Sequence, residues 1–257
     1  GYASAAKYIA TSCMEVYHDA RVYDTGMICI IEIMGRHAGW LTAAAGLATA
    51  AGAGPDLIYL PETDFDMDKF LAEVKKVYEE KGNCMVAVSE GIHYADGSFV
   101  SEAKTSATDG FGHAQLGGLA AMLADIVKKE TGAKVRGIEL SLLQRCGAHL
   151  ASQTDIDESF MAGKAAVENA VAGLTDKMVG FERCIEGGKY VCKTKLFNLT
   201  DVANTEKKVP IEWINAEHNG VTQAFVDYAL PLIQGETKMK KENGLPRFAR
   251  LKKVLAK

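Results

Sequence analysis

Short apolar runs that alternate with longer amphipathic stretches constrain the fold of this chain most. Residues 27–34 read MICIIEIM, a continuous apolar run that is typical of a strand buried on both faces of a sheet. Residues 84–92 (CMVAVSEGI) predict a second buried strand, and residues 41–52 and 64–82 between them predict helices. Strands and helices that alternate in this way predict βαβ units, and therefore an α/β fold with mainly parallel strands and right-handed connections.

The remaining elements continue this alternation and then break it. We expect further helices and strands, in chain order, as follows: helix before residue 21, strand 56–62, helix 114–132, strand 134–143, helix 155–173, strands 177–184 and 190–199, and a last helix after Val221. The Gly187-Gly188 pair between the last two strands is equally compatible with a hairpin turn. The chain ends in a basic segment.

Composition excludes several classes of protein. The net charge of −4 gives no global reason to expect nucleic acid or an anionic membrane as a partner. No apolar run approaches the roughly 20 residues of a membrane span, and no signal peptide is visible. The six cysteines are scattered without zinc-ligand spacing, which predicts reduced packing residues in a cytoplasmic protein.

Polar residues follow three of the predicted strands directly. These are Gly35-Arg36-His37, Ser89-Glu90-Gly91 and Gln144-Arg145-Cys146-Gly147. Ligands bind at the carboxyl ends of strands in parallel α/β sheets, so we expect the three groups to meet. Arginines fork onto phosphate, a glutamate accepts from sugar hydroxyls, and a helix start after Gly35 adds N–H groups. The pattern predicts a phosphate or sugar-phosphate site.

Simpler interpretations exist for each of these residues taken alone. An arginine after a strand is often a solvated end or a structural ion pair, and Glu90 is equally suited to capping a loop. His37 is more typical of a packing histidine than of a base, because no serine or cysteine partner is evident. A dinucleotide fold, with Glu62 on a ribose, is a further alternative. It is disfavoured because the turn is G-x-x-x-G and Arg36 would crowd the pyrophosphate.

Four blocks of the sequence resemble the phosphofructokinase family. They are MGRHAGW after the first strand, VSEG (88–91), DGFGHAQLGG (109–118) and LLQRCG (142–147). Their order and spacing match the family from about residue 1 to 173, and the MGR and QR motifs together are specific. The resemblance implies a three-layer, Rossmann-like fold with mainly parallel sheets. The long C-terminal part looks more like the pyrophosphate-dependent members than the short bacterial ATP enzymes.

The resemblance also implies roles for individual residues. Met34, Gly35 and Arg36 correspond to the turn that binds fructose 6-phosphate, and Arg36 would lie near the transferring phosphoryl group. Glu90 corresponds to a glutamate that holds a sugar hydroxyl. Arg145 corresponds to a ligand of the sugar's 6-phosphate.

Other positions concern the residues that bind the 6-phosphate. Arg136 matches an arginine that reaches the neighbouring subunit's 6-phosphate in tetrameric relatives. The chain departs from the family pattern at two places: Leu142 stands where a His or Tyr is usual, and Met27 stands where short bacterial enzymes have an intersubunit Arg. Lys104 and His113 are candidate replacements.

Two family blocks are not found in this sequence. The glycine-rich GGD block and the TIDND block, with its catalytic aspartate, precede the first helix in the family, and Asp109 and Asp155 have the wrong contexts to replace them. We therefore expect a C-terminal fragment that is inactive by itself, with the ligands of the Mg²⁺ cofactor in the missing part and none among the site residues named above.

The expected organisation follows from that resemblance. Residues 1–143 would form the fructose 6-phosphate domain, 144–220 part of the phosphoryl-donor domain, and 221–257 a helix and basic tail. The parent would phosphorylate the 1-hydroxyl of fructose 6-phosphate in glycolysis, with pyrophosphate favoured over ATP as donor. A homo-oligomer is expected. The alternatives are, from a different class, a non-catalytic sugar-phosphate-binding subunit and, less favoured, a Rossmann dinucleotide oxidoreductase.

Overall fold

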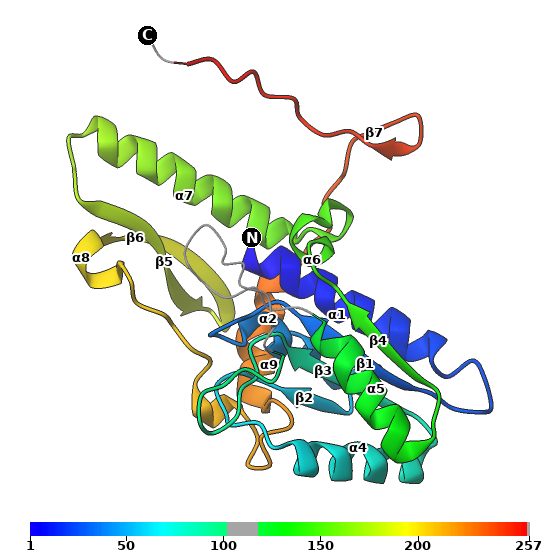
Figure 1. Ribbon diagram of the computed structural model, residues 1–257. Coiled ribbons are helices and arrows are strands. Elements are labelled where there is room, and N and C mark those ends of the chain that lie inside the picture. The colour runs from blue at the N-terminus through cyan, green and yellow to red at the C-terminus, as the bar shows by residue number, and fades with distance from the viewer. Residues whose placement is uncertain (102–117, 256–257) are drawn as a thin grey trace.

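The computed structural model of the chain describes residues 1–101 and 118–255 (Figure 1). The strands are β1 Ile28–Ile33, β2 Leu57–Tyr59, β3 Cys84–Ser89, β4 Val135–Glu139, β5 Lys177–Glu186, β6 Lys189–Asn198, β7 Lys241–Glu242 and β8 Leu245–Pro246. The α-helices are α1 Tyr2–Asp19, α2 Trp40–Ala43, α3 Ala45–Ala50, α4 Met67–Lys81, α5 Leu119–Thr131, α6 Leu143–Cys146, α7 Gln153–Val171, α8 Leu199–Val202 and α9 Gln223–Ala229. Short 3₁₀ helices are η1 Ala148–Leu150, η2 Ile211–Trp213 and η3 Leu230–Ile233.

A parallel sheet of order β2-β3-β1-β4 forms the middle layer. Strand β1 is buried along its whole length, and its successive side chains enter two different cores. Cys29, Ile31 and Ile33 face the core shared with α1, α3 and α9, whereas Ile28 and Ile30 face the core shared with α4 and α5. Because a strand points alternate side chains to opposite faces, two covered faces require an almost entirely apolar strand, and Glu32 is the one charged residue of β1. The predicted α/β fold is confirmed.

Helix α4 shows how local chemistry sets the limits of an element. The carboxylate of Asp66 accepts the backbone N–H of Lys69 at 2.9 Å, which caps the first turn. Gly82 ends the helix in the left-handed conformation, with a φ of +72°. Phe70 and Val74 bury the helix face that covers the sheet. The sequence predicts a helix over residues 64–82, and the structure confirms a helix there, capped at Asp66 and ended at Gly82.

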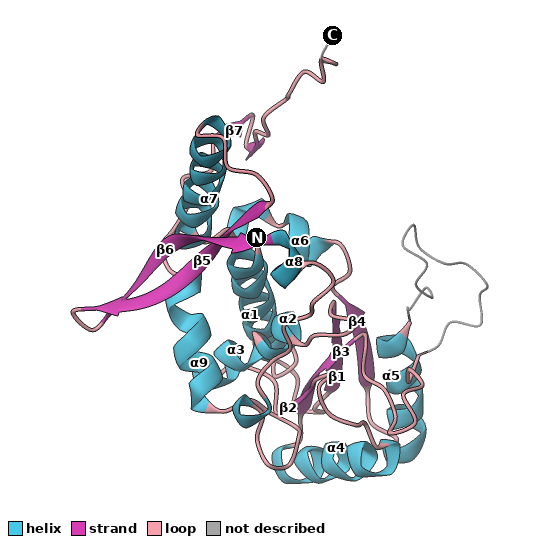
Figure 2. Ribbon diagram, turned by 90° about the vertical axis from the view of Figure 1, so that its left-hand side faces the viewer, coloured by secondary structure: helices cyan, strands magenta, loops and turns pink. Residues whose placement is uncertain are grey.

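The second part of the chain begins with α7 and a long hairpin. Strands β5 and β6 pair antiparallel through a turn at Gly187 and Gly188, both with positive φ. The hairpin alternative is therefore the correct one, and β5 and β6 form a sheet of their own beside α7 (Figure 2). Helix α7 has no buried residue, in contrast to α1, α4 and α5.

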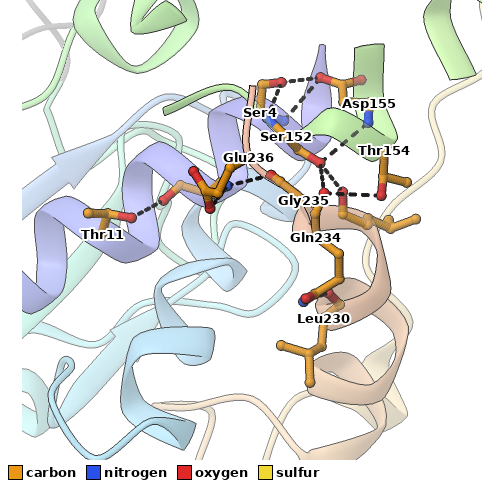
Figure 3. Close-up of polar contacts among 11 residues, drawn as sticks. Ser4, Thr11, Ser152, Thr154, Asp155, Leu230, Gln234, Gly235 and Glu236 are labelled. Carbon is orange, nitrogen blue, oxygen red and sulfur yellow. Dashed lines mark hydrogen bonds and ion pairs between the residues drawn. The ribbon is translucent and has the colours of Figure 1, made fainter. Parts of the chain in front are cut away.

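We call the core that β1 shares with α1, α3 and α9 the first core. A polar junction joins α7 to it (Figure 3). The buried hydroxyl of Ser152, the N-cap of α7, donates to the carbonyl of Leu232 at 2.7 Å and accepts the N–H of Asp155. The N–H of Ser152 donates to Ser4 Oγ at 3.1 Å, and Ser4 Oγ donates to Asp155. Lys7 on α1 binds Glu236 at 2.7 Å. Helix α1, the start of α7 and the chain after η3 are thus held together.

The chain then returns to the first core. Val209, Ile214 and Phe225 are buried in the same cluster as α1 and α3. The expected boundary at residue 220 falls within this returning segment, so residues on both sides of it share one core. Beyond the junction the tail from about residue 241 is exposed and runs away from the rest of the chain (Figure 1).

Two further observations concern the chain as a whole. Within residues 1–101 and 118–255, no helix combines the length and the apolar character needed to cross a membrane. All six cysteines are free thiols, and Cys13, Cys29 and Cys84 are buried. Burial raises the pKa of Cys13 to about 12, so this thiol stays protonated and acts as a packing group.

Candidate functional site

The turn between β1 and α2, residues 34–39, lies at the carboxyl edge of the sheet. Its second residue, Gly35, has a φ of +146°, a conformation that side-chain-bearing residues rarely adopt. The N–H of Gly35 donates to Glu90 Oε1 at 3.1 Å, and Ser89 Oγ donates to the Gly35 carbonyl at 2.5 Å. Ile33 and Ser89 are register partners in the paired strands β1 and β3. The sheet therefore brings the predicted Gly35-Arg36 and Glu90 groups together.

Gln144 attaches the third predicted group to the same turn. Its side chain is buried, accepts the N–H of Met34 at 3.2 Å and donates to the Ser141 carbonyl at 2.9 Å. The next residue, Arg145, is exposed and lines a cavity of about 180 Å³ together with Ser4. The glutamine thus fixes α6 against the turn and leaves the arginine facing solvent. The sequence names Gln144 only as part of the QR motif.

Gly91 is a second residue whose part sequence reasoning missed. A Cβ atom built on it would lie 1.8 Å from the Arg36 carbonyl oxygen and 2.4 Å from its carbon. Only glycine lets the end of β3 come this close to the backbone of the turn. In the sequence, only the Ser89-Glu90-Gly91 triplet places a glycine here, and nothing in it indicates that the backbone of the turn comes so close.

A cavity of about 270 Å³ opens beside the turn. Arg36, His37, His93 and Lys208 lie in its wall, together with Phe99 and two smaller residues. The described lining contains no carboxylate, so the cavity suits an anionic ligand. The ring of His37 packs against Phe99 with 6.3 Å between ring centres, as expected for a packing histidine.

The structure does not bring Arg136 to this edge. Arg136 is the second residue of β4 and pairs in register with Cys29, the second residue of β1, so it lies near the amino end of the sheet. The resemblance assigns Arg136 to the site of a neighbouring copy, and that role stays a prediction. Met27 is buried at the same end, with its N–H on Asn83 Oδ1.

Other residues proposed for the 6-phosphate are placed as follows. Leu142 is 55% exposed and takes part in no described apolar core. Lys104, His113 and Asp109 lie outside the described residues. Asp155 belongs to the junction at the start of α7, which agrees with the expectation that it does not replace a catalytic aspartate.

A buried glutamate lies two residues before the turn. Glu32 is 3% exposed, and its Oε2 accepts the N–H of Ala120 at 2.8 Å, in the first turn of α5. Burial raises its pKa, the Ala120 N–H lowers it, and the carboxylates of Glu139 and Glu90 raise it again. The pKa remains above that of an ordinary glutamate. Glu32 therefore links β1 to the start of α5.

The dinucleotide alternative has no support in this geometry. Glu62, which would contact a ribose, accepts the N–H of Gly39 at 2.8 Å and that of Val209 at 2.9 Å. One oxygen of its carboxylate is therefore bound to the backbone, and the other is buried. Among the described residues, no group of three or more His, Cys, Asp or Glu side chains is placed to hold a metal ion.

Comparisons with known proteins agree on one family. A family model described as phosphofructokinase matches residues 1–170. Curated proteins called pyrophosphate–fructose 6-phosphate 1-phosphotransferase, from Halomonas elongata and Methylococcus capsulatus, are 41% and 42% identical. Each match covers 98% of this chain but 60% of the relative. The crystal structure of pyrophosphate-dependent phosphofructokinase from Marinobacter aquaeolei superimposes with a TM-score of 0.86 at 38% identity, over 100% of this chain and 61% of that one. The chain thus spans about 60% of the length of these relatives.

Proposed function

The chain belongs to the phosphofructokinase family, and we propose that it carries the fructose 6-phosphate site of an enzyme that takes its phosphoryl group from pyrophosphate. The observation that carries the proposal is the turn at residues 34–39, which Glu90 and Gln144 hold at one sheet edge. Pyrophosphate is preferred to ATP because the similar proteins are named for that donor. The reaction would place the phosphoryl group on the sugar's 1-hydroxyl.

Each residue of the site has a part in this proposal. Glu90 binds Gly35 through Oε1, and its carboxylate has further acceptor capacity for a sugar hydroxyl. Arg145 is exposed, so its guanidinium can fork onto the 6-phosphate. Arg36 lines the cavity of about 270 Å³ beside the turn, which we call the cationic cavity. A positive charge there stabilises the negative charge that develops on a transferring phosphoryl group. Phosphoryl transfer requires mainly this kind of positioning and charge stabilisation.

Magnesium and cellular location are finer parts of the proposal. Mg²⁺ neutralises phosphate charge in phosphoryl transfer and takes oxygen ligands. Residues 1–101 and 118–255 offer no such group of ligands, so we assign the metal to none of them. A cytoplasmic location is supported by the six free thiols, which are typical of a reducing compartment.

Calorimetric titration of the chain with fructose 6-phosphate tests the proposal, with glucose 6-phosphate and NAD as controls. Selective binding of the fructose ester is the expected result. Binding of NAD instead would favour an oxidoreductase. Assays of phosphoryl transfer from pyrophosphate and from ATP, in a protein that contains this chain, then distinguish an enzyme from a non-catalytic sugar-phosphate-binding subunit.

Arg145→Ala is expected to weaken the affinity for fructose 6-phosphate by about ten- to hundred-fold. A hydrogen bond to a charged group contributes about 1.5–3 kcal/mol, and each 1.4 kcal/mol is a factor of about ten. Arg247→Ala, in the exposed tail, is the matched control and should bind as the wild type does. Equal affinity of Arg145→Ala and wild type would remove Arg145 from the site.

Assembly into a homo-oligomer is also part of the proposal. Ile156, Phe160, Val167 and Val171 are 44%, 75%, 64% and 84% exposed. Their spacing puts them on one stripe of α7, since residues four, eleven and fifteen positions apart on an α-helix share a face. Gly163 lies in the middle of the stripe, with nothing within 4 Å of its Cβ position, so another helix can approach closely. We propose that a second copy of the chain covers this stripe.

Phe160→Glu should therefore shift the chain towards the monomer in sedimentation velocity experiments. A carboxylate in the middle of an apolar contact loses its hydration without gaining a partner. Ala203→Glu adds the same charge at an exposed position after α8 and should leave self-association unchanged. A wild-type chain that sediments as a monomer at all concentrations would exclude the stripe as a contact between copies.

A further inference from the structure

Two carboxylates hold the two ends of the turn. Glu90, after β3, binds the N–H of Gly35, and Glu62, after β2, binds the N–H of Gly39 at 2.8 Å. Arg36, His37 and Ala38 lie between these two fixed points. Three residues leave little slack, because each spans at most about 3.3–3.6 Å. The path of the backbone at Arg36 is therefore set from both sides.

The same oxygen of Glu62 also holds a third segment. Glu62 Oε1 accepts the N–H of Val209 at 2.9 Å, and Val209 is buried in the core with α1 and α3. A buried N–H needs an acceptor, and one oxygen serves two segments that are 170 residues apart in sequence. Glu62 thus joins the turn to the chain that returns from the hairpin. Lys208, next to Val209, lies in the wall of the cationic cavity.

The place of the Glu62 carboxylate is fixed by shape as well as by hydrogen bonds. A Cβ atom on Gly39 would lie 2.6 Å from Glu62 Oε2 and 2.8 Å from Pro61 Cδ, so only glycine fits there. Glu62 Oε2 is buried and has no hydrogen-bond partner in the described part of the chain. Burial of an unpartnered carboxylate oxygen opposes folding. The contacts of Oε1 are the ones that offset this cost.

Glu62 itself does not line the cationic cavity. Pro61, Arg36 and Lys208 are among the residues that do. We propose that Glu62 is a positioning residue: it fixes the C-terminal end of the turn and so places Arg36 and Lys208 in the cavity wall. This inference rests on the proposed function, since it concerns the same site.

The first test compares affinities for fructose 6-phosphate by calorimetry. Glu62→Ala removes both hydrogen bonds and should weaken binding by about ten-fold or more, because each hydrogen bond to a charged group that the ligand loses costs a factor of about ten or more. Glu62→Gln keeps an acceptor oxygen and should stay within about three-fold of wild type, since neutral acceptors are weaker but sufficient. Wild-type affinity in Glu62→Ala would overturn the proposal.

Glu73→Ala is the matched control. Glu73 lies on α4 and accepts the hydroxyl proton of Tyr59 on β2 at 2.6 Å, so it supports the strand that carries Glu62 without touching the turn. Its removal should lower the melting temperature but leave the affinity unchanged. If Glu73→Ala weakens binding as much as Glu62→Ala does, the effect is one of general stability and the positioning role is excluded.

Amide hydrogen exchange gives a readout that needs no ligand. In Glu62→Ala, peptides that contain residues 35–40 should exchange faster than in wild type, whereas those of β1 and α4 should not. Glu62→Gln should restore the protection. Unchanged exchange at residues 35–40 in Glu62→Ala would overturn the proposal, even if the wild type binds no fructose 6-phosphate. Failure of wild-type binding alone would instead count against the proposed function.

Discussion

Phe225→Ala is expected to lower the free energy of unfolding by about 3–5 kcal/mol, the usual cost of truncating a buried aromatic side chain. Phe225 is 0% exposed and packs against Trp40 and Trp213, each with 6.4 Å between ring centres. The loss combines the transfer of the ring to water with the cavity that remains. Urea unfolding, followed by circular dichroism and by the fluorescence of the two tryptophans, measures it.

Phe248→Ala is the control for this experiment. Phe248 is 66% exposed in the tail, so its replacement should change stability by no more than about 0.5 kcal/mol. A large effect at residue 225 and none at residue 248 would place the domain boundary after the returning segment, beyond the predicted residue 220. A loss below about 1 kcal/mol in Phe225→Ala would mean that α9 is not part of the first core.

Gly91→Ala is expected to weaken the affinity for fructose 6-phosphate by about ten- to hundred-fold, because it displaces the turn that carries Arg36 and a lost hydrogen bond to a charged group costs about 1.5–3 kcal/mol. The new methyl group would lie 1.8 Å from the Arg36 carbonyl oxygen, which belongs to the backbone and cannot rotate away. The turn or the end of β3 must therefore move. Calorimetry on the variant gives the affinity directly.

Gly163→Ala adds the same methyl group where nothing lies within 4 Å. It sits in α7, where alanine is favoured over glycine by about 1 kcal/mol, so this control should be slightly more stable and bind normally. If Gly91→Ala binds fructose 6-phosphate as tightly as wild type does, the turn at residues 34–39 is not the sugar-phosphate site.

The parts of the fold that the sequence predicts well are those with a local physical cause. The two buried faces of β1 leave an apolar run without alternation, and the ends of α4 are set by Asp66 and Gly82. The convergence of Gly35 and Glu90 also follows from a general property of parallel sheets, that successive carboxyl ends lie along one edge.

Other features depend on neighbours that are distant in the sequence. Gln144, Gly91 and Glu62 each act on the backbone of the turn, and no periodicity or spacing marks an acceptor for a distant N–H group. The return of Phe225 to the first core is of the same kind. Its short helix has an ordinary composition, and only the packing against Trp40 reveals where it belongs.

The double burial of β1 has a consequence for how such a chain tolerates inserted or deleted residues. One residue added within β1 would exchange the side chains of its two faces, so that Cys29, Ile31 and Ile33 no longer met the core that they fill now. It would also displace the turn from Glu90. Length changes at residues 22–25, in the exposed loop after α1, leave the assignment of the β1 side chains to the two faces unchanged. The number of residues between the start of β1 and Arg36 is thus fixed in this architecture, whereas the exposed loop at residues 22–25 can vary in length.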